Sequence, residues 1–365
     1  MSKLIYLDNA ATTKTAPEVL EAMLPYFTEQ YGNPSAIYSF ASHNKDVVAE
    51  QRERIANALG AKSNEIYFTA GGSESDNWAL KATAEAYQNK GKHIITTKIE
   101  HHAILHTAAY LEERGFEVTY LDVDEYGKVN PADVEAAIRP DTILISVMYA
   151  NNEIGTIQPI KEIGAIAKEH GILFHTDAVQ AYAQIPINVD EYNIDMLSVS
   201  GHKIHAPKGT GFLFIKDKTK VKPLIYGGGQ QKGMRSGTEN VPGVAALGEA
   251  AEEIYENFEE KIDHLYQIKQ RFVEGVLKIE GVSVNGKTGR DSAPQIVSVS
   301  IDGVRSEVML HTLEDRKIYV SAGSACSSNK PSVSHTLTNI GLKGSLLDST
   351  IRFSFSVHTT EEEID

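Results

Sequence analysis

The sequence predicts an α/β protein built on a parallel sheet, followed by a smaller α+β region. From about residue 16 to residue 250, short apolar runs alternate with helix-length amphipathic stretches. Strand, helix and strand repeated in this order imply a parallel sheet with helices on both faces. The runs predicted to form strands are residues 66–68, 93–96, 118–121, 143–146, 172–175 and 196–199.

Helical spacing is clearest in two places. In residues 160–169, the positions of Ile163, Ile166 and Ala167 give one apolar stripe. A longer, charged helical pattern covers residues 249–277 and includes apolar Ile254, Phe258, Ile262, Leu265, Ile268 and Phe272.

Strand-like residues 296–301 and 351–355 follow the long helix, which suits a second domain. We expect a large domain over residues 16–250 and a small domain built from residues 1–15 and 251–365. Residues 360–363 carry a capping-box pattern that predicts the start of a helix. Because the sequence stops at Asp365, we expect that helix to be incomplete.

Composition narrows the class of protein. The 365 residues carry a formal net charge of −14, and such an acidic surface repels phosphate backbones, so direct nucleic-acid binding is not expected. No apolar stretch approaches the roughly 20 residues needed to span a bilayer, and no signal peptide is apparent. A soluble cytoplasmic protein is expected. The single cysteine excludes an internal disulfide and a multi-thiolate metal site.

Lys203 lies just after the predicted strand 196–199, among Ser, Gly and His residues. Ligands of parallel sheets bind beyond the carboxyl ends of the strands. A cationic neighbour would lower the pKa of this lysine and favour a covalent bond to an aldehyde. A solvated loop lysine is the alternative.

Asp177 follows the apolar residues 172–174. A carboxylate at the end of a buried strand is costly unless it meets a cation, and a protonated pyridine nitrogen is such a cation in pyridoxal-phosphate enzymes. The alternative is a helix N-cap. Because Asp177 and Lys203 are one crossover apart, both side chains can reach the same edge of the sheet.

Residues 69–77 follow a predicted strand and open a helix. Gly71 and Gly72 allow close backbone approach, and Ser73 with the free N–H groups of a helix start would bind an anion. A plain turn capped by serine is the alternative. A phosphate cradle, an aldehyde-binding lysine and a pyridinium-binding aspartate are together what pyridoxal 5'-phosphate requires.

Two further segments reach the same edge. His101 follows the strand 93–96, and its imidazole could stack on the cofactor ring and move protons. His101 and His102 are not expected to share a metal, because neighbouring residues of an extended chain point apart. Asn152 follows the strand 143–146, and its amide could bond the ring hydroxyl.

Cys326 stands in a run of small polar residues, 321–330, that can bury little. An exposed thiol there could carry covalent sulfur, although a lone cysteine can also be inert. Arg352, beside the strand 351–355, could bind a substrate carboxylate through two hydrogen bonds. A surface ion pair is its alternative.

These motifs resemble those of the class V aminotransferase family of fold-type I pyridoxal-phosphate enzymes, specifically the cysteine desulfurases. The resemblance implies a large domain with a mainly parallel seven-stranded sheet, and a small α+β domain that carries the Cys326 loop. The length of that loop is similar to the subgroup that serves iron–sulfur assembly and tRNA thiolation. The matching segments are residues 6–13, 32–35, 69–77, 100–102, 151–155, 177–180, 200–203, 235–238, 324–326 and 352–354.

The resemblance also implies a role for each site residue. Lys203 would bond the cofactor aldehyde, Asp177 the pyridine nitrogen, and Gln180 with Asn152 the ring oxygen. His101 would stack on the ring and act as acid and base. The substrate carboxylate would bind Arg352 and Asn33, and the Cys326 thiolate would take sulfur from L-cysteine and leave L-alanine. The phosphate would be held by Gly72, Ser73, Ser200 and His202, and by Thr238 of the second subunit of a homodimer.

The sequence alone leaves three hypotheses about function open. The first is a cysteine desulfurase that passes its persulfide to an acceptor protein, either an iron–sulfur scaffold or a tRNA thiolase. The second is a class V aminotransferase or a selenocysteine lyase, which would share Lys203 and Asp177 but would not need Cys326. The third is an inactive binding partner of an assembly machine, against which the intact set of site residues argues.

Overall fold

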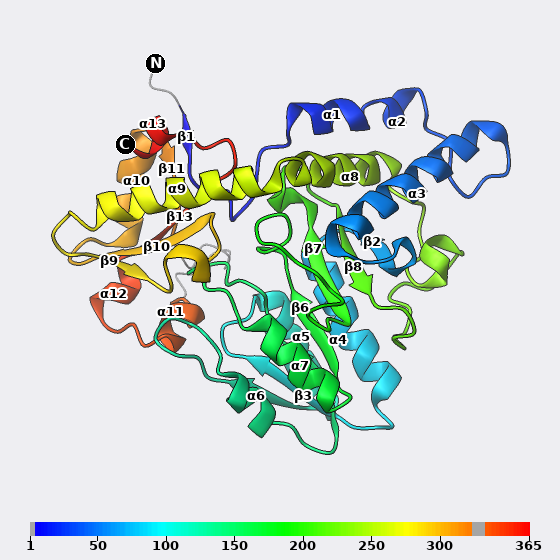
Figure 1. Ribbon diagram of the computed structural model, residues 1–365, viewed down its shortest axis with the longest axis horizontal. Helices are drawn as coiled ribbons and strands as arrows, with labels where there is room; N and C mark the ends of the chain where they lie inside the picture. The colour runs from blue at the N-terminus through cyan, green and yellow to red at the C-terminus, as the bar shows by residue number, and fades with distance from the viewer. Residues whose placement is uncertain (1–3, 323–332) are drawn as a thin grey trace.

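The structure is a computed structural model that describes residues 4–322 and 333–365. Its centre is a seven-stranded sheet in the order β2-β8-β7-β6-β5-β3-β4 (Figure 1). The neighbours β3/β4, β3/β5, β5/β6 and β6/β7 run parallel. The strands are β2 (Ile66–Thr69), β3 (His93–Thr97), β4 (Glu117–Leu121), β5 (Thr142–Ser146), β6 (Leu173–Asp177), β7 (Met196–Ser200) and β8 (Gly211–Ile215). All six strands expected from the apolar runs are therefore present, and the mainly parallel sheet is confirmed.

The resemblance implied seven strands, which the sheet has, but no apolar run had been assigned to the seventh strand, β8. It runs antiparallel to both of its neighbours, β7 and β2. β7 ends at Ser200 and β8 begins at Gly211. This connection is too short for the crossover helix that a parallel neighbour needs, so the chain turns back on itself.

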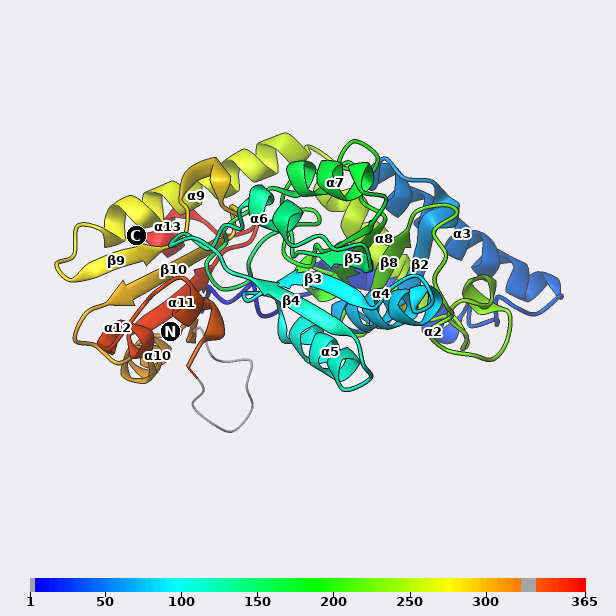
Figure 2. The same ribbon diagram turned by 90° about the horizontal axis from the view of Figure 1, so that it is seen from below.

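Helices cover both faces of this sheet (Figures 1 and 2). Alternate residues of its strands face opposite cores. On β3, Ile95 belongs to one apolar cluster while Ile94 belongs to the other. The first face is covered by α3 (Ser39–Leu59), α7 (Ile160–Glu169) and α8 (Val241–Tyr255), and the second by α4 (Gly72–Tyr87) and α5 (His102–Glu112). The helix predicted at residues 160–169 is confirmed. Shorter helices are α1 (Pro17–Met23), α2 (Pro25–Thr28) and α6 (Pro131–Ala136), with 3-10 turns η1 (Ser63–Glu65), η2 (Gly201–Lys203) and η3 (Gln230–Gly233).

The carboxyl-terminal part forms an antiparallel sheet of four strands in the order β12-β13-β10-β9. Its apolar core packs against α9. The amino-terminal strand β1 joins this part by pairing in parallel with β11. The elements are β1 (Ile5–Tyr6), α9 (Phe258–Val276), β9 (Val282–Asn285), η4 (Gly289–Asp291), β10 (Ile296–Ile301), α10 (Ser306–Asp315), β11 (Ile318–Tyr319), β12 (Ser321–Ala322), α11 (His335–Asn339), α12 (Ser345–Asp348), β13 (Thr350–Ser354) and α13 (Glu361–Ile364).

The long helical pattern over residues 249–277 is two helices and not one. α8 ends at Tyr255 and α9 begins at Phe258, because Asn257 adopts a left-handed conformation with φ +57°. Asparagine tolerates this conformation better than most residues. Ile254 packs in the core of the large sheet, Ile262 packs in the core of the small sheet, and Phe258 contacts both. The domain division near residue 250 stays a prediction.

The last helix, α13, has both hydrogen bonds of the capping box between Thr360 and Glu363, as expected. Arg271 of α9 holds it through ion pairs with Glu361 (2.9 Å) and Asp365 (2.6 Å). Within residues 4–322 and 333–365, no helix has the length and apolar character needed to cross a membrane.

Lys269 is a buried cation in the small core. Its Nζ donates to Ser292 Oγ at 2.7 Å and to the carbonyl of Ala293 at 2.8 Å. Burial lowers the pKa of this ammonium group from 10.5 to about 7, since the charge loses its hydration.

We predict that Lys269→Met changes the free energy of unfolding by an amount that depends on pH. Between about pH 7 and pH 10.5 the unfolded chain binds a proton at Lys269 that the folded chain has released, so this group makes stability rise with pH in that window. Relative to the parent, Lys269→Met should therefore be most stable near pH 6, and this difference should shrink towards pH 10.

Guanidinium chloride titrations at both pH values measure the difference. Lys278→Met, at an exposed position just after α9, is the matched control and should show no such dependence. Equal differences for Lys269→Met at the two pH values would contradict the prediction.

Candidate active site

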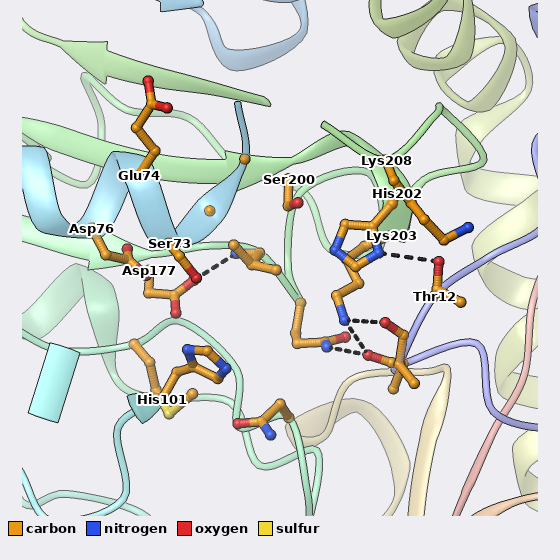
Figure 3. A pocket seen from close by; sticks show the side chains of 18 of the residues that line it. Thr12, Ser73, Glu74, Asp76, His101, Asp177, Ser200, His202, Lys203 and Lys208 are labelled. Carbon is orange, nitrogen blue, oxygen red and sulfur yellow. Dashed lines mark hydrogen bonds between the residues drawn. The ribbon is translucent and has the colours of Figure 1, made fainter. Parts of the chain in front are cut away.

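A cavity of about 620 Å³ opens beyond the carboxyl ends of β5, β6 and β7, and the start of α4 also lines it (Figure 3). This is where ligands of parallel sheets bind. Most of the predicted site residues line it: Gly72, Ser73, His101, Asn152, Asp177, Gln180, Ser200, His202, Lys203 and Arg352. Asn33 and Thr238 are exposed and lie outside this lining in the single chain, and Cys326 lies outside the described residues.

Asp177 is the last residue of β6 and is 5% exposed. Its Oδ1 accepts a hydrogen bond from the backbone N–H of Val179 at 2.9 Å. Burial raises the pKa of this carboxyl to about 6, against the opposing effects of the Val179 hydrogen bond and of the Lys203 charge. No α-helix follows Asp177, so it is not an α-helix N-cap. Its carboxylate is a buried acceptor that a cation in the cavity would stabilise.

A second carboxyl group, Asp76 of α4, lies beside it. Asp76 is fully buried, and burial, followed by the repulsion from Asp177, raises its pKa well above the ordinary value. Its Oδ1 has no hydrogen-bond partner among the described residues and lies 3.8 Å from His175 Nε2. The ligand atoms of Asp76, His101 and Asp177 lie within 4.8 Å of one another. The two carboxyl groups at this end of the cavity therefore favour a bound positive charge.

Lys203 stands at the opposite side, in the 3-10 turn η2 after β7. Its Nζ donates to the carbonyl oxygens of Ala10 (2.5 Å) and Ala11 (2.7 Å). Lys203 is therefore held in the cavity and is not a solvated loop lysine (Figure 3).

His101 is the N-cap of α5, and its Nδ1 accepts a hydrogen bond from the backbone N–H of Ala103 at 3.1 Å. Burial lowers its pKa to about 4, assisted by Lys203 and by the neighbouring histidines. The ring is therefore neutral near pH 7. Because Nδ1 accepts, the proton lies on Nε2.

Small residues and free N–H groups line the start of α4. Gly71, with φ +147°, precedes the helix, and a Cβ on Gly72 would come within 2.5 Å of Val179 Cγ2. The first N–H groups of this 16-residue helix have no partner inside it, so they suit an anion. Ser73, Ser200 and His202 line the cavity with this helix start, as the sequence predicted.

Two residues near the start of α4, His202 and Glu74, contact other side chains. Burial lowers the pKa of His202 to about 4, with help from Lys203 and Lys208, and its Nδ1 lies 3.2 Å from Thr12 Oγ1. Glu74 forms a two-pronged ion pair with Arg235, at 2.8 Å and 3.2 Å, which holds segment 235–238 against α4.

Arg352 enters the cavity from β13 of the small sheet. Its guanidinium donates to the carboxylate of Asp8 at 2.8 Å and to the carbonyl of Asn152 at 2.9 Å. The side chain is 5% exposed, so this is not a surface ion pair. Its Nε is buried and has no hydrogen-bond partner in the described part of the chain. Each terminal nitrogen also carries a second N–H, so the guanidinium keeps donors for a further acceptor.

Several cavity residues had no role assigned to them from the sequence. Asp76 lies within the motif 69–77, but its position inside a helix does not reveal from the sequence which way its side chain points. The amino-terminal segment supplies Ala10, Ala11 and Thr12, and the Ala10 carbonyl also accepts from Gln180 Nε2 at 3.0 Å. That segment matched the family pattern in residues 6–13, which was the only available signal.

Known proteins are similar in sequence to this chain along its whole length. The Aminotransferase class-V family model matches residues 5–365. The chain is 51% identical to Cysteine desulfurase IscS of Methanosarcina thermophila over 100% of its own length and 90% of that protein. It is 47% identical to Putative cysteine desulfurase IscS 1 of Bacillus subtilis (strain 168), over 99% of the chain and 95% of that protein.

Solved structures agree with the fold. A structure named NIFS-LIKE PROTEIN superposes with a TM-score of 0.94 at 37% identity, covering 100% of this chain and 96% of that one. A second, named SspA in complex with cysteine, has a TM-score of 0.85 at 38% identity, covering 98% of this chain and 100% of that one.

Proposed function

The chain belongs to the class V aminotransferase family, and from this premise we propose that it is a pyridoxal-phosphate-dependent cysteine desulfurase. One observation carries the proposal: Lys203, Asp177 and the glycine–serine turn before α4 line a single cavity. If these three features faced different cavities, they could not hold one cofactor. The names of the curated relatives support the choice of reaction within the family.

The cavity residues offer a suitable partner for each polar group of pyridoxal phosphate. The buried Asp177 carboxylate would pair with the pyridinium, and Lys203 would bond the aldehyde. The start of α4 with Ser73, Ser200 and His202 would hold the phosphate. Gln180 and Asn152 would bond the ring oxygen.

The proposed reaction moves one sulfur atom from L-cysteine to Cys326. The carbon–sulfur bond of the substrate breaks, a sulfur–sulfur bond to Cys326 forms, and the proton given up by the attacking thiol replaces sulfur on the substrate carbon. The products are L-alanine and a Cys326 persulfide. When bound, the cofactor supplies the sink for the electron pair that this cleavage requires.

Arg352 is the proposed carboxylate anchor of the substrate. Asp8 and the Asn152 carbonyl each accept one N–H of its two terminal nitrogens, and the second N–H of each nitrogen remains for an incoming carboxylate. The guanidinium is thus oriented before substrate arrives, which reduces the entropy lost on binding. L-Cysteine as substrate also agrees with the solved relative named as a complex with cysteine.

His101 would lie against the cofactor ring as a neutral imidazole that donates from Nε2. An acid–base role needs Nδ1 to give up the hydrogen bond from Ala103, because that contact occupies its lone pair. We therefore propose that His101 first orients the ring and moves a proton only after the start of α5 adjusts.

We propose that the persulfide passes to a sulfur-acceptor protein, either an iron–sulfur scaffold or a tRNA-thiolating enzyme. The basis is the resemblance of the long loop around Cys326. We also propose a homodimer in which Thr238 serves the cavity of the second subunit, since Thr238 is exposed in the single chain.

An exposed apolar face supports the dimer. Phe27 of α2 is 57% exposed, and Ile37 before α3 is fully exposed. Apolar side chains gathered in one region of a surface mark a protein interface. The other members within residues 20–40 are Leu20, Leu24, Tyr31, Tyr38 and Phe40.

Changing Cys326 to Ser tests the reaction. The variant should lose sulfide release from L-cysteine in the presence of dithiothreitol, because the hydroxyl cannot accept sulfur. It should keep the visible absorption of bound pyridoxal phosphate, because the proposed cofactor residues are unchanged. Sulfide and alanine are measured together, with Ser328→Ala as the control from the same segment. Sulfide release at the parental rate by Cys326→Ser would identify a different reaction.

Changing Arg352 to Gln tests the carboxylate anchor. A charged hydrogen-bonded pair contributes about 1.5–3 kcal/mol, so kcat/KM for L-cysteine should fall by roughly 10- to 100-fold. Asp8→Asn should give a smaller loss, mainly in KM, because it only loosens the guanidinium. Arg305→Gln, at an exposed arginine on the small domain, should leave both constants unchanged. An unchanged KM in Arg352→Gln would assign the carboxylate to another residue.

Changing Phe27 to Glu together with Ile37 to Asp tests the dimer. A charge at each position should make the dimer dissociate, because an ion cannot be buried at an interface without a partner. Light scattering of the purified holoprotein should give the mass of a dimer for the parent and of a monomer for the double variant. Ile279→Asp, at a residue 59% exposed outside this face, should remain a dimer. A dimer of the double variant would place the interface elsewhere.

A further inference from the structure

Asp76 is a buried carboxyl group to which the proposed reaction assigns no role. It belongs to α4, is 1% exposed, and lines the cavity beside Asp177 (Figure 3). One carboxylate oxygen of each residue lies within 4.8 Å of the other. We propose that Asp76 is the neutral, protonated member of a carboxyl pair, and that it positions the Asp177 carboxylate for the pyridine nitrogen of the cofactor. This inference rests on the proposed function, because it takes pyridoxal phosphate as the group in the cavity.

The helix that carries Asp76 is fixed against the sheet. The preceding residue, Ser75, is fully buried, and its Oγ lies 2.8 Å from Thr69 Oγ1 and donates to the carbonyl of Phe212 at 3.1 Å. These contacts join α4 to β2 and β8, so a rotation of the helix that brought Asp76 to the surface would break them. The carboxyl group therefore stays buried, where a charge is costly without a cationic partner.

The neighbouring imidazole does not supply that charge. Within residues 4–322 and 333–365, the one ion-pair contact of Asp76 is to His175, whose Nε2 lies 3.8 Å from Asp76 Oδ1. Both nitrogens of His175 already have hydroxyl partners at 2.9 Å, Ser146 at Nδ1 and Ser198 at Nε2. Burial lowers the pKa of His175 to about 3, so the ring is neutral near pH 7. A negative charge on Asp76 would therefore lack a counter-charge among these neighbours.

The charges around Asp76 favour a proton on its carboxyl group. Burial and the repulsion from Asp177 raise the pKa of Asp76 well above its ordinary value; a hydrogen bond with Ser198 opposes this rise, and Glu100 adds to it. Asp177 is better able to hold a charge, because its Oδ1 accepts the backbone N–H of Val179. Two carboxyl groups this close do not both ionise cheaply, so one proton stays with the pair. The contacts assign that proton to Asp76.

A pair with one proton carries one negative charge, which matches the single positive charge of a pyridinium. A neutral Asp76 removes the repulsion on Asp177 and presents an O–H group to it. Across a separation of this length, one water molecule can carry the hydrogen bond. Such a bond would supplement the one from Val179 and fix the orientation of the Asp177 carboxylate. Asp76 would thus act through Asp177 and would not need to touch the cofactor.

The test compares three substitutions in the pyridoxal-phosphate-loaded protein. Asp76→Asn keeps a neutral side chain of the same shape with an N–H donor, so the affinity for the cofactor should match that of the parent. Asp76→Leu keeps the approximate size but has no donor, so the dissociation constant of the cofactor should rise about tenfold or more. Asp177→Asn removes the charge itself and should cause the larger loss.

The protonation of the cofactor ring is the second measurement, because a merely structural role of Asp76 would not change it. The NMR chemical shift of an isotopically labelled ring nitrogen reports this protonation in the loaded protein. The nitrogen should stay protonated in the parent and in Asp76→Asn, and should lose its proton in part in Asp76→Leu and most completely in Asp177→Asn. Asp315→Leu, at an exposed position on α10, is the matched control and should behave as the parent does.

Two outcomes would overturn the inference and leave the proposed function standing. If Asp76→Asn lost affinity and ring protonation as Asp177→Asn does, Asp76 would carry a charge. If Asp76→Leu matched the parent, Asp76 would not position Asp177. Should Asp76→Leu not fold, Asp76→Val, a smaller apolar replacement, repeats the comparison. A parent protein that bound no pyridoxal phosphate would reject the proposed function and this inference with it.

Discussion

The buried carboxylate of Asp177 is the constraint around which the site is arranged. It lies at the end of β6, next to the fully buried Asp76, and burial raises the pKa of both groups. Two carboxyl groups held together in a low-dielectric interior cannot both carry charge cheaply without a cation. The Asp177 Oδ1 receives one backbone N–H, and Lys203 stands across the cavity, where it donates to the carbonyls of Ala10 and Ala11. A cationic ring between them would relieve this cost, which is why the cavity suits pyridoxal phosphate.

The amino-terminal segment connects the two halves of the molecule to this cavity. β1 pairs with β11, Asp8 holds Arg352 of β13, and Thr13 bonds through its backbone N–H and its hydroxyl to the carbonyl of His202. A displacement of the small sheet would thus move three groups as one unit: Arg352, Asp8 and the carbonyls that bind Lys203. If substrate binds at Arg352 as proposed, its binding would for this reason be coupled physically to the position of Lys203.

The sequence alone was sufficient to predict the structure where a local pattern and a general rule of topology coincide. Apolar runs marked six strands, and the rule that ligands lie beyond the carboxyl ends of parallel strands brought Asp177 and Lys203 together. It was insufficient where the outcome depends on partners distant in the chain. The pairing of Asp8 with Arg352, 344 residues apart, has no local signature. The break between α8 and α9 depends on one residue, Asn257, inside an apolar stripe that continues from one core into the other.

Segment 100–102 places neighbouring side chains in different surroundings. Glu100 is fully buried and accepts from Met148 N–H and Thr97 Oγ, His101 lines the cavity, and His102 contacts His335 instead. Neighbouring side chains of an extended segment point apart, so the two histidines cannot share a ligand, yet the same segment positions both. The Glu100 carbonyl orients His335, and His101 caps the helix that carries His102 and His106. At the N-terminus of this helix, the contact between Ala103 and His101 sets which nitrogen of His101 carries its proton.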